Sequence, residues 1–445
     1  MTHCISLTYQ ANPEDIFLNL RHLPDFVWLD SGRPYNSQGR YDIFTAEAQS
    51  KAVVAGTGQV EIDNVITTDA DAVEKWLQTH IAIMLDANLD LPFTGGIVGY
   101  FGYHWQDAAF GLSRSQAEQT PRVQLASYDW AIIIDHQRQT TTAVFSYAQH
   151  WAIAQLLPLL EQTPPPLKAF SCGEFTANTT KTQYLAAVET VQDYIRSGDC
   201  YQVNLSQRFQ ADYKGDLDNA YLTLRQATPS PFSAYIKHPE HSILSLSPER
   251  FLQFLGRQVL TQPIKGSSPR GQTPEQDQQL AAALQNSPKN RAENVMIVDL
   301  LRNDLSRCCK PFSVKVPHLC ELHTFSNVHH LMSTVTGELK DEFSAFDLFK
   351  KSFPGGSITG APKKRAMEVI AELENNTRGI YCGSVAYFSK NGNADSSITI
   401  RTLHALNNTL YCWGGGGVVI DSIAEEEYAE SLFKVQKLMA ALSGH

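Results

Sequence analysis

Strand-like segments in this chain follow one another in runs, and this order constrains the fold more than any other feature of the sequence. Apolar runs at 131–134 and 142–145 flank a polar stretch, which predicts a β-hairpin. The segment 95–103 predicts a buried strand. Further strand-like segments lie at 242–246, 259–264, 384–388, 396–403 and 409–413. Because successive parallel strands need a helix between them, the order predicts an α+β fold and not a doubly wound sheet.

Helix-like segments lie mainly in the second half of the chain. Four of them are expected, at 182–197, 274–285, 288–305 and 424–442. Pro274 and Pro288 stand where a helix tolerates proline, and Asp421 or Ser422 is a candidate cap for the last helix. Three consecutive prolines make the segment 163–168 a stiff linker, so we expect a division of the chain into 1–168 and 169–445.

The charge and the cysteine pattern exclude several classes of function. The 445 residues carry 36 Lys and Arg against 46 Asp and Glu, a net charge of -10, which argues against binding to nucleic acid. Apolar runs stay shorter than about 18 residues, so no membrane span is expected. The first residues do not resemble a secretory signal, and the eight cysteines form no C-x-x-C pair. We therefore predict a cytoplasmic protein with reduced thiols.

Several acidic residues occur in informative places. Glu293 lies within a mostly apolar helix-like segment, while Glu427, Glu430 and Lys434 have the spacing of one helical face. The plain interpretation of the last helix is a solvated stripe with an ion pair between Glu430 and Lys434. The alternative is a site for Mg²⁺, which binds a few carboxylates together with oxygens of a substrate.

Three other segments each allow two interpretations. The glycines at 414–417 fit a tight turn, or a place where a ligand carboxylate or another backbone approaches closely. Lys265 fits a solvated lysine, or an amine nucleophile with a lowered pKa. Glu249 fits a surface pair with Arg250, or a general acid with a raised pKa. The residues alone leave these alternatives open.

Taken together, the segments closely resemble a known family, the chorismate-utilising enzymes. In family order, the chain contains SPERF, PIKG, RAENVMIVDLLRNDL, VHHL, GGSITGAPK, GIYCGSVAYF, SITIRT, GGGG and EEEYAESLFK. The resemblance covers residues 182–437, and more loosely the earlier part through GGIVGYFGY and YDWAIIID. It implies two large, mostly antiparallel sheets packed as a sandwich with helices outside. It also implies that 169–445 is the catalytic domain, and that 1–168 is similar to the N-terminal region of anthranilate synthase component I.

Two positions distinguish branches of this family. Gln202 stands where isochorismate and salicylate synthases carry a lysine that activates water, and Lys265 stands where anthranilate synthases carry alanine. The resemblance therefore implies the aminodeoxychorismate synthase branch, whose component I aminates chorismate at C4 to give 4-amino-4-deoxychorismate for folate synthesis. The alternatives are an anthranilate synthase component I, and a non-catalytic protein that binds chorismate or tryptophan.

The family motifs also imply roles for individual residues. Glu249 matches the general acid, and Lys265 the lysine that adds to C2 of chorismate. Mg²⁺ is implied as the cofactor, with Glu293 and Glu430 as direct ligands and Glu427 as a ligand through water. The expected substrate-binding residues are Tyr381, Arg401, Gly415, Gly417, Lys434, Ser357, Thr359 and His330. Asn290 departs from family members that have an acidic residue there.

Two further expectations concern regulation and partners. The residues that match a tryptophan pocket, with an ordinary inter-domain core as the alternative, are Ser31, Arg40, Tyr41, Pro231, Phe232 and Ser233. The chain contains no Gly-x-Cys-x-Gly segment, which would mark a glutaminase nucleophile. We therefore expect ammonia to come from a separate glutamine amidotransferase subunit, and the later lyase step to belong to another protein.

Overall fold

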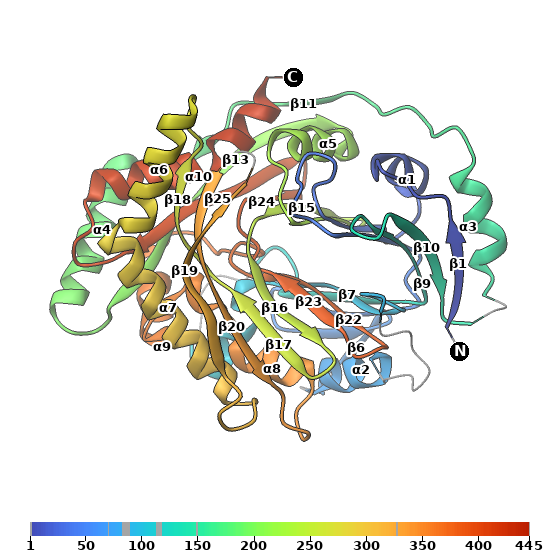
Figure 1. Ribbon diagram of the computed structural model, residues 1–445, viewed down its shortest axis with the longest axis horizontal. Helices are drawn as coiled ribbons and strands as arrows, with labels where there is room; N and C mark the ends of the chain where they lie inside the picture. The colour runs from blue at the N-terminus through green and yellow to red at the C-terminus, as the bar shows by residue number, and fades with distance from the viewer. Residues whose placement is uncertain are drawn as a thin grey trace.

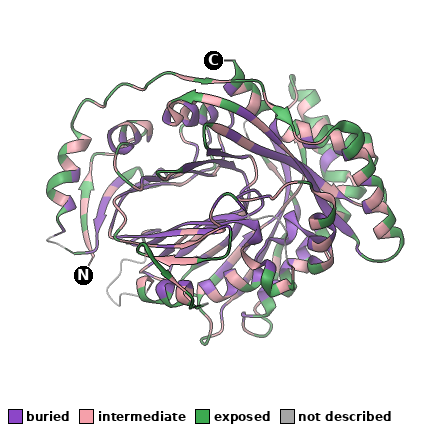
Figure 2. Ribbon diagram, turned by 180° about the vertical axis from the view of Figure 1, so that it is seen from behind, coloured by how far each residue is buried: buried purple, intermediate pink, exposed green. Residues whose placement is uncertain are grey.

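The computed structural model describes residues 2–69, 71–81, 90–112, 118–147, 150–325 and 328–444, and these ranges form two large antiparallel sheets surrounded by helices (Figure 1). The α+β prediction is thereby confirmed. None of the helices in these ranges combines the length and the apolar character that crossing a bilayer requires. In Figure 2 the buried residues are concentrated in the strands, whereas the outer helices carry most of the exposed ones.

The first sheet contains strands from both ends of the chain. In spatial order its strands are β1 (His3–Leu7), β10 (Thr140–Phe145), β9 (Trp130–Asp135), β3 (Tyr41–Thr45), β2 (Val27–Asp30), β14 (Phe232–Lys237), β15 (His241–Ser247), β24 (Thr402–Leu406), β25 (Thr409–Val418), β13 (Gln202–Gly215) and β11 (Phe170–Cys172). The short strands β12 (Thr176–Ala177) and β21 (Gly360–Ala361) also pair with β13.

The second sheet is built in the same way. Its strands are, in order, β18 (Ile264–Pro269), β20 (Val328–Glu338), β17 (Gln258–Gln262), β16 (Arg250–Leu255), β23 (Ala394–Ser397), β22 (Ser384–Ser389), β7 (Gly96–Phe101), β8 (Val123–Tyr128), β4 (Ser50–Val54), β5 (Val60–Ile62) and β6 (Val65–Thr67). An additional strand, β19 (Lys315–Thr324), pairs with β20.

Helices cover the outer faces of the sheets. They are α1 (Glu14–Leu20), α2 (Ala72–His80), α3 (Ala152–Leu160), α4 (Lys181–Arg196), α5 (Leu217–Ala227), α6 (Pro274–Asn286), α7 (Pro288–Ser306), α8 (Ala345–Ser352), α9 (Lys363–Leu373) and α10 (Ala424–Ser443), with 3₁₀ turns η1 (Tyr103–Phe110) and η2 (Gly356–Ile358). The helices α1, α3, α5 and α10 share an apolar cluster with the first sheet, and α2, α7 and α8 share one with the second sheet.

The alternation of side chains along the strands explains this layered packing. In β2, Trp28 packs under the helices of the first sheet, while Val27 belongs to the cluster between the sheets. In β9, Ile132 and Ile133 divide in the same way. Because side chains of a strand point alternately to opposite faces, a strand covered on both faces has a continuous apolar sequence. This accounts for the run at 131–134 that predicted the β9–β10 hairpin, which the structure confirms.

Both sheets continue across the proline linker. Strand β2 pairs with β14 in the first sheet, and β7 pairs with β22 in the second. The linker carbonyls of Pro165 and Pro166 accept hydrogen bonds from the buried Arg21 side chain. The division at residue 168 therefore separates segments of sequence that share both sheets, and two domains at 1–168 and 169–445 stay a prediction.

Two local predictions were wrong. The segment 396–403 was expected to be one strand, but β23 ends at Ser397 in the second sheet and β24 begins at Thr402 in the first. The chain crosses between the sheets here, with Arg401 at a φ of 51° and the Thr399 hydroxyl bonded to the Ile380 carbonyl. The expected cap of α10 is also absent: Ile423 precedes the helix, and Ser422 donates to the Glu427 carboxylate instead.

A group of histidines lies between the two sheets. His404 in β24 is 3.3 Å from His241 in β15, and the His241 Nε2–H donates a bond of 2.8 Å to Gln124 Oε1 of the second sheet. Burial lowers the pKa of His241 to about 4 and that of His404 to about 3. These rings are therefore neutral in the folded protein near pH 7.

Replacing His404 with Gln should make the stability depend less on pH. Because the folded-state pKa values lie below the ordinary value of 6.5, the unfolded chain binds more protons as the pH falls from 6.5 towards 4, so the unfolding free energy falls with it. When the pH falls from 7 to 4.5, the unfolding free energy of the variant should decrease by on the order of 2 kcal/mol less than that of the wild type. Urea unfolding at both pH values measures this, and equal losses would contradict it.

Candidate active site

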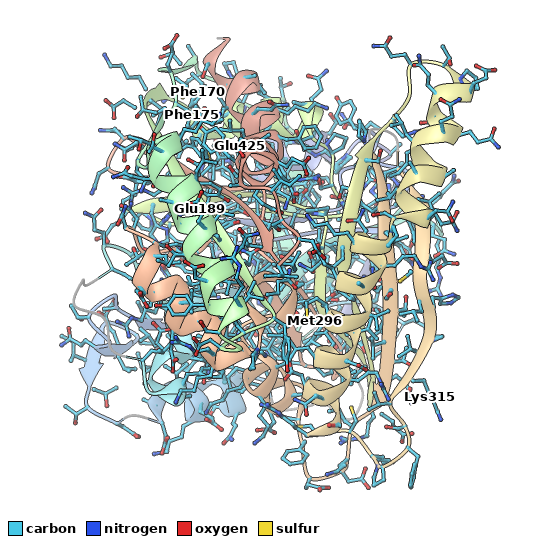
Figure 3. All side chains as sticks on the ribbon, turned by 90° about the vertical axis from the view of Figure 1, so that its left-hand side faces the viewer. Phe170, Phe175, Glu189, Met296, Lys315 and Glu425 are labelled. Carbon is cyan, nitrogen blue, oxygen red and sulfur yellow. The ribbon has the colours of Figure 1, made fainter. Side chains whose placement is uncertain are left out.

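A cavity of about 360 Å³ collects most of the residues that the sequence singled out. Its walls come from β18, α7, β20, β25, α10 and the loops before β16, β22 and β24. Figure 3 views the side of the molecule on which α4 and α10, with Glu189 and Glu425, lie to one side and α7, with Met296, lies to the other. The predicted residues that line the cavity are Glu249, Lys265, Glu293, His330, Ser357, Tyr381, Arg401, Gly415, Gly417, Glu430 and Lys434.

Glu249 is a buried carboxyl group next to Ser357. It is only 4 % exposed, and its carboxylate accepts a hydrogen bond of 2.6 Å from the Ser357 hydroxyl. Burial raises the pKa of Glu249, although the Ser357 bond and the nearby Lys265 oppose this shift. A surface pair with Arg250 does not form, because Arg250 binds Asp395 at 3.0 Å. A carboxyl group with a raised pKa in a cavity can act as a general acid.

Lys265 points into the same cavity. Its ammonium group donates a hydrogen bond of 2.6 Å to the backbone carbonyl of Ser357. Burial lowers the pKa of Lys265, while the carboxylates of Glu293 and Glu249 raise it. Lys265 is thus a partly buried lysine of the cavity wall, and its role as a nucleophile stays a prediction. Ser357 contacts both groups, with its hydroxyl on Glu249 and its carbonyl on Lys265.

Three acidic residues lie at the end of the cavity formed by α7 and α10. Glu430 forms an ion pair of 2.6 Å with Lys434, which lowers the pKa of Glu430. Glu427 is buried behind it and accepts bonds from Ser422 at 2.6 Å and Lys289 at 3.1 Å. Burial raises the pKa of Glu293, opposed by Lys265 and Lys289. The predicted Glu430–Lys434 ion pair thus forms, and it lines the cavity while staying partly exposed to solvent.

This donor set fits a cation that takes only part of its coordination from the protein. Within the described ranges, no three His, Cys, Asp or Glu side chains form a ready-made metal site. Glu293 and Glu430 both line the cavity, and a Cβ atom on Gly416 would lie 3.1 Å from Glu427 and 3.2 Å from Glu430. Two or three carboxylates with room for a ligand suit Mg²⁺, which retains waters and binds substrate oxygens.

The four glycines belong to β25 and not to a tight turn. A Cβ atom on Gly414 would lie 2.0 Å from the Ser431 carbonyl of α10, so the glycine allows the helix backbone to contact the strand. Gly415 and Gly417 line the cavity, and the Gly415 carbonyl accepts a bond of 2.8 Å from Lys434. The close backbone approach, one of the two interpretations left open, is therefore what the glycines provide.

Arg401 brings a positive charge to the cavity. Burial lowers the pKa of its guanidinium, and within the described ranges no Asp or Glu forms an ion pair with it. Nearby, burial lowers the pKa of His330 to about 3, so its ring is neutral, and its Nε2 atom is buried without a hydrogen-bond partner in the described structure. A cation that lines a cavity without an ion-pair partner in the described ranges suits an anionic ligand, because a carboxylate of that ligand can pair with it.

The structure also separates residues that the sequence had grouped. Thr359 does not line the cavity, since its hydroxyl donates to the Gly355 carbonyl at 3.0 Å, and Glu427 lies behind the wall. Conversely, Asn204, Lys289, Trp413 and Phe433 line the cavity without having been predicted. Lys289 could have been found, because it precedes Glu293 by four residues and so shares its helical face.

A second cavity of about 460 Å³ contains most of the predicted tryptophan pocket. Arg40, Tyr41, Pro231, Phe232 and Ser233 line it. Ser31 is buried outside it, where its hydroxyl donates to Asp42 at 2.8 Å. Arg40 is paired with Asp135 at 2.9 Å. Binding of tryptophan at this place stays a prediction.

Replacing Gly414 with Ala should destabilise the protein. The added methyl group would meet the Ser431 carbonyl at 2.0 Å, and backbone atoms cannot give way as a side chain can. We expect a loss of about 1–3 kcal/mol in unfolding free energy, measured by urea denaturation. Gly173→Ala is the matched control, since the nearest atom to its methyl group would be 3.5 Å away. Equal stability of both variants would contradict the close packing of α10 on β25.

Comparisons with known proteins find relatives of this chain over most of its length. Residues 26–440 match the family model described as chorismate binding enzyme. The chain is 44% identical to aminodeoxychorismate synthase component 1 of Escherichia coli (strain K12), over 97% of this chain and 96% of that protein. It is 34% identical to anthranilate synthase component 1 of Lactococcus lactis subsp. lactis (strain IL1403), over 96% of each chain.

A solved structure supports the fold as well. The crystal structure of anthranilate synthase component I from Streptococcus pneumoniae TIGR4 superimposes with a TM-score of 0.81, at 31% identity, over 90% of this chain and 92% of that one. The predicted sandwich of two large antiparallel sheets is thereby confirmed. The match over most of the chain and the arrangement of the cavity lead to one conclusion: the chain belongs to the family of chorismate binding enzymes.

Proposed function

We propose that this chain aminates chorismate at C4 with ammonia and releases 4-amino-4-deoxychorismate, a precursor of 4-aminobenzoate. The observation that carries the proposal is the position of Lys265, which shares the cavity with Glu249 and contacts the same residue, Ser357. The sequence identity is 44% to a protein named aminodeoxychorismate synthase component 1 and 34% to one named anthranilate synthase component 1, which supports the same branch.

The chemistry requires an acid and a nucleophile with shifted pKa values. The 4-hydroxyl group is a poor leaving group, so Glu249 gives it a proton and it departs as water. The neutral amine of Lys265 forms a bond to C2, the two ring double bonds shift from C1=C2 and C5=C6 to C1=C6 and C4=C5, and the C4–O bond breaks. Splitting one displacement into two through a covalent intermediate is the general advantage of nucleophilic catalysis. The raised pKa of Glu249 and the lowered pKa of Lys265 favour these protonation states.

Ammonia completes the reaction. It forms a bond to C4, the two double bonds shift back to C1=C2 and C5=C6, and the C2–N bond breaks, which returns Lys265 as a neutral amine. The new ammonium group gives one proton to the Glu249 carboxylate, so both side chains regain their starting forms. Overall, chorismate and ammonia yield the amino product and one water.

Basic groups of the cavity would bind the carboxylates of the substrate. Arg401 forms no ion pair with an Asp or Glu of the described ranges, and Lys434 donates to the Gly415 carbonyl of β25. An arginine can bind a carboxylate through two parallel hydrogen bonds. Tyr381, held by stacking on Trp413 at 5.9 Å, would line the remaining wall together with Gly415 and Gly417. Thr359 would act only through the backbone of its turn.

We propose Mg²⁺ as the cofactor, with Glu293 and Glu430 as direct ligands and Glu427 as a ligand through water. When bound, the ion would attract the ring carboxylate and stabilise negative charge in the ring. The Lys434 and Lys289 ammonium groups, which contact Glu430 and Glu427, balance this acidic cluster from the protein side.

Ammonia would be supplied by a separate glutamine amidotransferase. The relatives carry the name component 1, and the sequence has no Gly-x-Cys-x-Gly segment of its own. The chain by itself should therefore use ammonium salts. This dependence separates the proposal from a non-catalytic role as a chorismate or tryptophan sensor, which would give no product.

Replacing Lys265 with Met should abolish formation of the amino product. Methionine has a similar length but no nucleophilic amine, so we expect a fall of at least about 10³-fold in kcat. The assay supplies chorismate, Mg²⁺ and an ammonium salt, and identifies the product by mass spectrometry. Lys310→Met, a change in a lysine that pairs with Glu338 at the end of β20 and outside the cavity, is the control and should keep full activity.

Two outcomes would contradict the proposal. Direct formation of anthranilate by the wild type would assign the chain to the anthranilate synthase branch. Full activity of Lys265→Met with the 4-amino product would keep the reaction but remove the covalent role of the lysine.

A further inference from the structure

We propose that Arg378 is a positioning residue of the reaction, which holds the Ser357 segment in the geometry that Glu249 and Lys265 require. Arg378 is only 1 % exposed and lies on the loop before β22, outside the lining of the cavity. This inference rests on the proposed amination of chorismate, and it assigns a function to a buried ion pair that the chemistry above does not use.

The guanidinium of Arg378 connects three segments around the cavity. It donates to the carbonyl of Ile358 at 3.1 Å and to the carbonyl of Asn204 at 2.6 Å. Its planar group also lies over the ring of Tyr103, at 4.6 Å from the ring centre. These contacts join the η2 turn, strand β13 and the start of η1 at one point.

A single carboxylate balances this charge and extends the connection. Glu374 accepts bonds of 2.8 Å and 2.7 Å from two nitrogens of Arg378. The same Glu374 carboxylate accepts bonds of 2.8 Å from the backbone and from the hydroxyl of Ser206, in β13. An ion pair with two parallel hydrogen bonds fixes the orientation of the guanidinium group, because each N–H must point at its acceptor.

The connection reaches the catalytic pair through one peptide unit. Ile358 directly follows Ser357, whose hydroxyl binds Glu249 and whose carbonyl binds Lys265. Holding the Ile358 carbonyl therefore limits the rotation of the turn that presents both groups of Ser357. Asn204 contributes from the other side, since its backbone N–H bonds to the Thr359 carbonyl at 2.9 Å. Misplacement of reacting groups by about 1 Å can reduce a rate by 10²-fold.

Other buried arginines lack this connection. Arg21 is 6 % exposed and also donates to backbone carbonyls, those of Pro165 and Pro166 in the linker. It lies close to Asp216 and Asp218, at 4.0 Å and 3.8 Å, and none of these residues lines the cavity. A purely structural role predicts the same effect for both arginines, namely loss of stability without a specific effect on the reaction.

The test compares Arg378→Met and Arg378→Lys with Arg21→Met, each in the full chain. Thermal unfolding is measured first, so that kinetics are recorded at a temperature at which all proteins are folded. We expect Arg378→Met to reduce kcat by at least tenfold and to change KM for chorismate by less than threefold, because Arg401 and Lys434, the basic groups proposed to bind the carboxylates, lie on other segments. Arg378→Lys should recover part of kcat, and Arg21→Met should keep both constants.

A double-mutant cycle with Ser357→Ala separates positioning from general damage. If Arg378 acts through the Ser357 turn, the kcat of the double variant should be no lower than the kcat of the less active single variant. A double variant whose fold-loss in kcat equals the product of the two single fold-losses would overturn the inference. A wild-type kcat in Arg378→Met would overturn it as well. If Arg378→Met does not fold, the cycle is carried out with Arg378→Lys, and the same two outcomes decide. A wild type that forms no amino product would instead refute the proposed function.

Discussion

The site depends on the burial of two groups of opposite charge on either side of one serine. Glu249 and Lys265 both contact Ser357, and burial shifts the pKa of each towards its neutral form. The mutual attraction of the two charges opposes these shifts, so the balance between desolvation and attraction sets the fraction of enzyme with a protonated acid and a free amine. The elements around the cavity maintain this balance by excluding water from Glu249 and Lys265 and by holding Ser357 in place.

The two-sheet fold creates that environment by letting the chain cross between sheets beside the cavity. Between β23 and β24 the chain leaves the second sheet and enters the first, and Arg401 stands at this crossing. The glycines of β25 allow α10 to contact the strand, which brings Glu430 and Lys434 to the same place. The crossing between the sheets thus places the cationic Arg401 at the cavity, and the packing of α10 on β25 places the acidic Glu430 there.

The sequence predicted much of this arrangement and missed what depends on tertiary contact. Periodicity found β9, β10, α4, α6 and α7, because their apolar patterns are local. It joined β23 and β24 into one strand, since an apolar run does not reveal a change of sheet. The residues alone left the role of Lys265 open, and the resemblance to the family implied the nucleophile. Arg378 gave no signal, because its function depends on carbonyl groups of Ile358 and Asn204, far away in sequence.

The central claim is that the Lys265 amine bonds to the substrate ring. Mass spectrometry of the intact protein, acid-quenched after mixing with chorismate and Mg²⁺ without ammonia, tests it most directly. We expect an adduct with the mass of chorismate less one water, and peptide mapping should locate it on Lys265. The adduct should disappear when ammonium is added before quenching. An unmodified protein that still converts chorismate to the 4-amino product at full rate would contradict the account.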